Sequence, residues 1–148
     1  MHKLATTLVG TCVVLGLQAL TGCAYGPPIR ITPGPRIAGV STPDAVVGAL
    51  AELGFIISAV DAPSGLVSAQ RDSRELPFGN VHVLVRDQVQ AVLGAGGVLV
   101  TSQAECRFAT TDWGPCRDIE GQTRLQETIA GEYREVYDHV AAAGVTRP

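Results

Sequence analysis

The sequence predicts an α+β domain in which a four-stranded antiparallel sheet carries both helices on one face. Apolar residues recur at helical spacing in two segments, one early in the domain and one near the end of the chain. Between them lie four stretches rich in β-forming residues, arranged as two hairpins. No helical segment separates one strand from the next, as a parallel βαβ unit requires. The order α-β-β-β-β-α therefore favours an antiparallel sheet.

The first helix is expected to begin at Thr42-Pro43-Asp44. Threonine suits the N-cap, proline the first helical position, and aspartate the positive end of the helix dipole. Apolar residues then recur at helical spacing up to Leu53, and Gly54 supplies a stop. The sequence thus predicts one short amphipathic helix at the start of the domain.

The first hairpin follows this helix directly. Residues 55–60 and 66–71 are dense in β-forming side chains, and the Asp-Ala-Pro-Ser-Gly segment between them has the composition of a turn. Residues 72–80 are mostly polar and contain Pro77 and Gly79, so we expect a surface loop there.

The second hairpin joins residues 81–93 to residues 98–108 through Gly94-Ala95-Gly96-Gly97. In the second of these strands the even-numbered residues, Cys106 among them, are expected to face the core. In the first strand the odd-numbered residues share one face, which Asp87 interrupts. We expect a bulge or a bend in that strand around the aspartate. The glycine-rich turn opens no helix, so it predicts a hairpin and not a phosphate-binding loop.

The last element is predicted to be a helix over residues 122–143. One apolar stripe runs along it from Leu125 to Val140 in steps of three and four residues. Glu132, Glu135 and Asp138 lie together on another side of this helix. We expect these acids to form a solvated face and not a carboxylate pair for acid–base chemistry.

The beginning of the chain has the pattern of a secretory signal peptide. Met1-His2-Lys3 is a short basic start, and residues 4–20 form an apolar run that ends in Leu20-Thr21-Gly22-Cys23. This last motif resembles the lipobox of bacterial lipoproteins. The resemblance implies that residues 1–22 are a signal peptide, cut off before Cys23, and that Cys23 carries the lipid. The alternative is a short uncleaved transmembrane helix over residues 4–20, at the lower limit of spanning length.

The resemblance also implies a location. Acyl chains on Cys23 would hold the protein on a membrane while its body stays in water. Lipoproteins with aspartate after the cysteine tend to stay in the inner membrane, whereas this chain has Ala24. The likeness therefore favours the outer membrane, with the protein facing the periplasm.

Residues 23–42 are predicted to form the lipidated cysteine and a tether, which leaves residues 43–148 as the domain. The segment contains Pro27, Pro28, Pro33 and Pro35, and it has no periodic apolar face. An extended proline-rich spacer of this length would reach at most ~60 Å. The alternative is that residues 29–37 lie along the domain as an edge strand.

Composition excludes a basic nucleic-acid-binding surface. The formal net charge is −3, Lys3 is the only lysine, and the arginines are scattered along the chain without a cluster. The chain is long enough for one domain with its own core and too short for two ordinary ones.

The cysteines predict one disulfide. Cys12 lies in the signal peptide and Cys23 is assigned to the lipid, so Cys106 and Cys116 remain as an even pair in an oxidising compartment. Their bond would close a loop around Trp113. The alternative is a reactive or metal-binding thiol, but a metal site needs about three or four ligands at compact spacing, and no histidine lies near these cysteines in sequence.

The histidines do not predict a catalytic site. His82 is expected on the outward face of a strand and His139 late in the last helix, both in contact with solvent. Cys106 with His82 could be drawn as a nucleophile–base pair, but the surrounding sequence does not support it. We therefore assign no catalytic residue, no metal ligand and no cofactor.

Two classes of function remain open. The first is a non-enzymatic interaction or accessory module that docks on an envelope protein or the cell wall, using the sheet face that carries Leu84, Leu99 and Thr101. The second is a small-ligand or lipid-binding protein with a pocket between sheet and helices. The predicted first helix and hairpin, with Leu53-Gly54-Phe55, Asp61 and Ser64-Gly65-Leu66-Val67-Ser68-Ala69, are similar to small bacterial lipoprotein domains of unassigned role.

Overall fold

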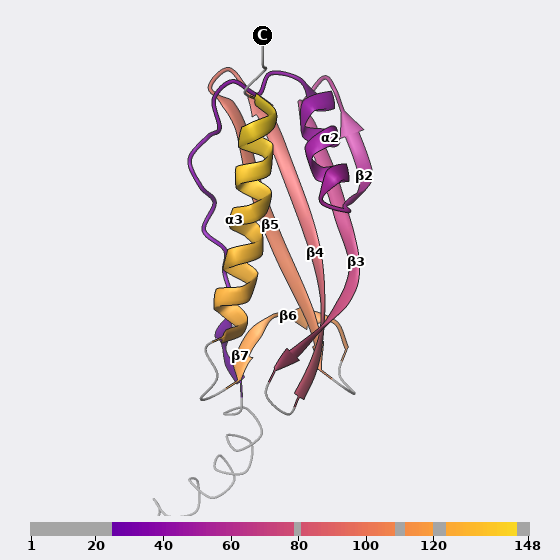
Figure 1. The fold of residues 1–148 in the computed structure, drawn as a ribbon, viewed down its shortest axis with the longest axis vertical. Coiled ribbons are helices and arrows are strands. Elements are labelled where there is room, and N and C mark those ends of the chain that lie inside the picture. Colours follow the sequence, from indigo (N-terminus) through magenta and orange to yellow (C-terminus); the bar gives the residue numbers. More distant parts are fainter. Residues whose placement is uncertain (1–24, 79–80, 109–111, 120–123, 145–148) are drawn as a thin grey trace, which may run out of the picture.

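The computed structural model describes residues 25–78, 81–108, 112–119 and 124–144. Over these residues the chain is an α+β domain with two helices and a five-stranded antiparallel sheet (Figure 1), so the predicted fold class is confirmed. The predicted signal peptide and Cys23 lie outside the described residues. Neither described helix combines the length and the apolarity needed to cross a bilayer.

The main sheet contains both predicted hairpins and one additional short strand. Its strands, in their order across the sheet, are β2 (Ile56–Asp61), β3 (Leu66–Phe78), β4 (Val81–Gly94), β5 (Gly97–Phe108) and β6 (Gly114–Pro115). The predicted four-stranded sheet was one strand short of the five-stranded main sheet of the described residues. The fifth is β6, which follows the last predicted strand, and its Gly114 pairs with Cys106 of β5.

Strand β3 continues where we expected a loop, so the loop predicted at residues 72–80 was wrong over residues 72–78. Arg71 pairs with Asp87, whereas Arg74 pairs with Val85. Two residues of β3 therefore bulge out opposite one residue of β4.

The irregularity that Asp87 predicted thus lies in the neighbouring strand and not in β4. The pairing of β4 with β5 runs without a shift from Val83 to Gly94. The bulge in β3 places both Arg71 and Arg74 on the helix side of the sheet, close to the carboxylate of Asp87.

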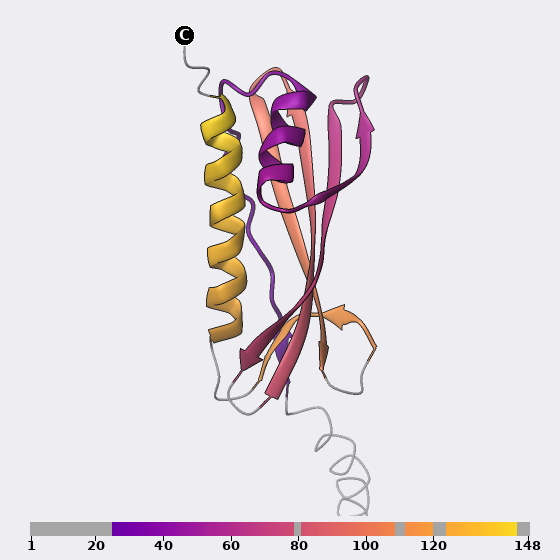
Figure 2. The same ribbon diagram turned by 45° about the vertical axis from the view of Figure 1, so that its right-hand side comes forward.

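Two helices cover one face of the sheet. Helix α2 (Pro43–Glu52) begins as predicted, with Thr42 as its N-cap and Pro43 in its first turn. Helix α3 (Arg124–Gly144) confirms the predicted C-terminal helix. Figure 1 and Figure 2 show that α3 runs the length of the molecule, while α2 covers only the end that carries the β4–β5 turn. We call this the upper end, and the end with β6 the lower end.

The buried side chains form two clusters, which lie one above the other along the sheet. The upper cluster is Ile37, Val40, Val46, Ala49, Leu50, Phe55, Val67, Ala69, Val89, Ala91, Val98, Val100, Tyr133, Val136 and Val140. The lower cluster is Val83, Val85, Cys106, Cys116, Leu125 and Ile129. Both contain residues of α3 and of the sheet, but α2 contributes only to the upper one.

The segment that we expected to be a tether packs on the domain. Strand β1 (Tyr25–Pro28) pairs with β7 (Arg117–Ile119) in a second, two-stranded sheet at the lower end. Residues 29–40, here called the strap, then run beside α3 to the upper end (Figure 1), where Ile37 exchanges backbone hydrogen bonds with Val98. The alternative of a segment lying along the domain therefore describes this part of the chain, although as a single bridge and not as a continuous edge strand.

Specific contacts hold the strap in place. The Tyr133 hydroxyl accepts a hydrogen bond from the N–H of Gly34 at 2.9 Å and donates one to the carbonyl of Val100, also at 2.9 Å. At the upper end Gly97 has a φ of 101°, and a Cβ there would lie 2.1 Å from the carbonyl oxygen of Ile37. Only glycine allows so close an approach. The folded unit of the described chain therefore begins at β1 and not at residue 43.

Candidate functional site

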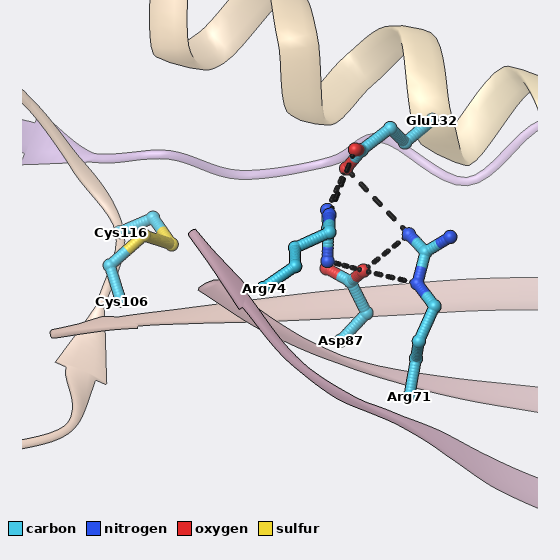
Figure 3. A network of polar contacts seen from close by, with 6 residues as sticks. All are labelled: Arg71, Arg74, Asp87, Cys106, Cys116 and Glu132. Atoms are coloured by element: carbon cyan, nitrogen blue, oxygen red, sulfur yellow. Dashed lines mark hydrogen bonds and ion pairs between the residues drawn. A yellow bond between two sulfur atoms is a disulfide. The ribbon is translucent and has the colours of Figure 1, made fainter. Parts of the chain in front are cut away.

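A network of four charged side chains lies in the middle of the helix-covered face (Figure 3). Arg71 Nη2 lies 2.7 Å and Arg74 Nη1 2.6 Å from the same oxygen, Oδ2 of Asp87. Arg74 also donates two hydrogen bonds to the carboxylate of Glu132 on α3, one of them from Nε to Oε1 at 3.1 Å. Two cations and two anions thus neutralise one another across β3, β4 and α3.

This charge network separates the two core clusters. Asp87 is only 5% exposed and lies between Val85 of the lower cluster and Val89 of the upper one. Glu132 likewise lies between Ile129 and Tyr133 on α3. Because each carboxylate accepts hydrogen bonds from arginine, the network clamps α3 to the sheet and is suited to holding structure.

Sequence reasoning missed this site. Glu132 was expected on a solvated face, and that prediction was wrong: its carboxylate binds Arg74, whereas Glu135 and Asp138 are exposed. The sequence did contain a signal for this site, namely Asp87. A charged residue on the inward face of a strand needs a partner of opposite charge. Arg71 and Arg74 were the nearest cations on the preceding strand, but they had been divided between a strand and a loop.

The predicted disulfide between Cys106 and Cys116 is confirmed (Figure 3). The two Cα atoms are 4.7 Å apart, and both residues are buried in the lower cluster. The bond joins β5 to the short segment between β6 and β7. Since the sulfur of Cys106 is bonded, the alternative of a nucleophilic thiol acting with His82 does not describe this site.

The two histidines of the described chain lie on the surface, as expected, and each meets one glutamate. His82 Nδ1 is 2.6 Å from Oε1 of Glu75, with both side chains more than half exposed. His139 Nε2 is 2.7 Å from Oε2 of Glu52, which joins α3 to the end of α2. Among the described residues, no group of three or more His, Cys, Asp or Glu side chains is placed to hold a metal ion.

The sheet face opposite the helices carries an aromatic–arginine cluster. Trp113 precedes β6 and lies on this face, with the guanidinium carbons of Arg86 and Arg107 at 4.5 and 5.3 Å from its ring centroid. Arg86 also donates a 2.6 Å hydrogen bond from Nε to Glu105. Cation–π contacts of this kind hold the half-buried indole beside the sheet.

The rest of this face is mostly polar or half-buried, apart from the exposed Val92 and Ile56. Leu84, Leu99 and Thr101, expected there from their parity, are half-buried. Four glutamines are exposed on it, namely Gln70, Gln88, Gln90 and Gln103. Of the described chain, only the segment leading into β6 crosses this face, at its lower end. The disulfide is the covalent support of the Trp113 cluster, because Cys116 follows β6 directly.

The strap is flanked by two cavities. One, of about 480 Å³, lies between the strap and α3 and includes Ile29, Arg30, Ala130, Tyr133 and Arg134 in its lining. The other, of about 570 Å³, lies between the strap and β5 and includes Ile31, Ser102 and Ala104. Between Ile29, whose N–H bonds to the carbonyl of Cys116, and Ile37, which bonds to Val98, no backbone hydrogen bond of the described chain joins the strap to β5.

Comparison with known proteins adds a structural neighbour. Neither a family model nor a curated protein matches this chain. The crystal structure of a DUF4468 family protein from Bacteroides ovatus ATCC 8483 is similar, with a TM-score of 0.53 and 15% sequence identity. The match covers 76% of this chain and 85% of that chain. At this identity the likeness concerns the fold alone.

Proposed function

We propose that this chain is a lipoprotein of the outer membrane, anchored through Cys23 and facing the periplasm. In this role it acts as a non-enzymatic interaction module of the cell envelope. The anchor is supported by the likeness of Leu20-Thr21-Gly22-Cys23 to the lipobox. The interaction role is supported by one observation above all, the Trp113 cluster on the sheet face that carries no helix.

Tryptophan and arginine are the side chains most enriched at the energetic centres of protein interfaces. Here they are joined, because Arg86 and Arg107 both pack on the ring of Trp113. The disulfide fixes the segment that carries the indole, so little side-chain freedom would be lost when a partner binds. A rigid aromatic anchor beside polar strand residues is the arrangement that an interaction surface requires.

The pairing of β1 with β7 determines how the domain would be held. Cys23 is two residues before Tyr25, which pairs with Ile119 at the lower end. Two extended residues span at most about 7 Å, so a lipid on Cys23 would hold the lower end of the domain next to the membrane. The Trp113 cluster lies at the same end. A partner on this surface would therefore lie close to the bilayer.

The anchor is tested on the full chain expressed in the bacterium that encodes it. Mass spectrometry should find a mature protein that begins with an acylated Cys23, and Cys23→Ser should abolish the modification. A membrane-bound protein that retains Met1 would instead support the uncleaved transmembrane helix.

The interaction surface is tested by crosslinking in intact cells. Trp113→Ala should reduce the crosslinked partner to background, because it removes the anchor of the surface. Ile56→Ser is the matched control: Ile56 is 52% exposed on β2, at the opposite edge of the sheet. Recovery of the same partner with Trp113→Ala, at an unchanged melting temperature, would refute this surface.

A second candidate function, binding of a small ligand or lipid, is favoured by the cavity between the strap and α3. Its floor includes the apolar Ile29 and Ala130, and Arg30 and Arg134 lie at its rim. A thermal-shift screen with phospholipids and small anions would favour this function if a ligand raised the melting temperature. The Arg134→Ala variant should then lose that shift.

A further inference from the structure

The outer edge of β5 is paired at both ends and open between them. At the upper end both backbone groups of Val98 bond to Ile37, at 2.8 and 3.0 Å. At the lower end Cys106 pairs with Gly114 of β6. In an antiparallel ladder the groups that point away from a given neighbour recur at every second residue. The N–H and C=O groups of Val100, Ser102 and Ala104 therefore point outward as well, away from β4.

Within the described chain, these inner groups of the edge have few partners. The carbonyl of Val100 accepts the hydrogen bond of the Tyr133 hydroxyl. For Ser102 and Ala104 the described residues provide no strand partner on this side. The strap supplies none here: Pro33 and Pro35 have no N–H, and the N–H of Gly34 is bonded to Tyr133.

A cavity of about 570 Å³ occupies the space between this edge and the strap. The edge of β5 forms one wall. The opposite wall is formed by Pro28, the last residue of β1, and by Ile29, Ile31 and Pro33 of the strap. A second folded sheet cannot reach β5 here, because the strap stands in front of the edge. A single extended chain can enter between the two walls below Val100, where no side chain of the described residues bridges them; at Val100 the Tyr133 hydroxyl joins the strand to Gly34 of the strap.

We propose that this groove binds an extended peptide segment of a partner protein, which adds a strand to β5 between β6 and Val100. The groove is lined by residues 101–105 of β5, and Glu105 already pairs with β6, so the guest would pair with residues 101–104 and be about four residues long, ~13 Å when extended. Its backbone would run antiparallel to β5, in line with Gly114–Pro115 below and Ile37 above.

The groove also predicts which side chains the guest carries. Guest residues opposite Ser102 and Ala104 share the helix side of the sheet, where Ile31 packs against both core clusters. Guest residues opposite Thr101 and Gln103 share the polar face. An alternating peptide, with small apolar residues at one parity and polar residues at the other, is complementary to this site. The inference rests on the proposed interaction role, but it depends neither on the anchor nor on Trp113.

Selection from random hexapeptides displayed on phage, against the purified full chain in detergent, tests the proposal. Ser102→Pro removes one outward N–H and leaves the ladder with β4 intact, and proline is tolerated on a strand edge in this orientation. Ser102→Ala is the matched control, because it removes the hydroxyl and keeps the N–H. We expect alternating peptides that bind the wild type and Ser102→Ala equally and bind Ser102→Pro roughly tenfold more weakly.

A second measurement keeps the test decisive if Ser102→Pro fails to fold. Methylation of the peptide nitrogens that face β5 should weaken binding to the wild type by a similar factor, since it removes the guest's donors. Failure to select any alternating hexapeptide, or equal binding of the methylated peptide, would overturn the proposal. Loss of crosslinking in Trp113→Ala with peptide binding intact would separate this groove from the surface proposed above.

Discussion

The upper and the lower halves of the core are built by different means. The upper cluster lies under both helices and consists of aliphatic and aromatic residues from α2, α3, the strap and three strands. The lower cluster lies under α3 alone, is smaller, and includes both halves of a disulfide. One end of the domain therefore relies on buried apolar area, and the other adds a covalent bond to a limited core.

The charge network lies between the upper and the lower cluster. It connects β3, β4 and α3 at the level where α2 has ended, beside Phe55, on whose ring Arg71 packs at 4.9 Å. A layer of paired charges fixes the register of α3 on the sheet, because each carboxylate must meet its arginine. Hydrophobic packing alone allows a helix to slide more easily. Buried apolar area thus stabilises the upper end of the domain, paired charges its middle, and a covalent bond its lower end.

The largest effect is expected from Asp87→Ala. It leaves Arg71 and Arg74 partly buried without their shared partner, which should lower the free energy of unfolding by about 3–5 kcal/mol. Asp72→Ala, in the exposed part of the bulge, is the control and should stay within about 0.5 kcal/mol of the wild type. Urea titration of both variants measures this. Equal effects of the two substitutions would show that the network contributes nothing specific.

A smaller effect, confined to the lower half, is expected when Cys106 and Cys116 are both replaced by alanine. The chain-entropy estimate for a loop of this size gives a loss of about 2–3 kcal/mol. Amide exchange should accelerate at Val83 and Val85 more than at Val89 and Ala91. The wild type under reductant should behave in the same way, and uniform acceleration along β4 would contradict a local role.

The smallest effect is expected from Thr42→Ala, which acts on the upper half alone. It removes the hydrogen bond that the Thr42 hydroxyl accepts from the N–H of Ala45, at a cost of about 1 kcal/mol. The neighbouring Ser41→Ala is the control. Exchange should increase at Ala45 and leave Val83 unchanged. A change at Val83 would mean that the two halves unfold as one unit.

Local signals in the sequence were sufficient for much of this fold. Thr42-Pro43-Asp44 specified a helix start, and the stripe from Leu125 to Val140 specified the last helix, because both patterns depend on neighbours in sequence. The two hairpins followed from their turns, and the disulfide followed from the elimination of Cys12 and Cys23. The α+β class needed no further information.

The remaining features depend on contacts between distant residues. The second half of β3 was missed because Arg74 points inward and breaks the apolar alternation, and because Pro77 lies where β3 has become an edge strand. Ile37 and Val40 show no period of their own, so their burial is visible only once α3 and β5 are in place. The charge network was missed because its four members come from three elements, so no local pattern in the sequence connects them.

The pairing of β1 with β7 decides where a mechanical load on the N-terminus would go. A pull at Tyr25 reaches the β1–β7 ladder, and the hydrogen bond from Ile29 to Cys116, before it reaches the rest of the strap. Cys116 is bonded to Cys106, so part of the tension passes through a covalent link into β5, which is paired with β4 along its length. The strap above Ile29 is relieved of that part of the force.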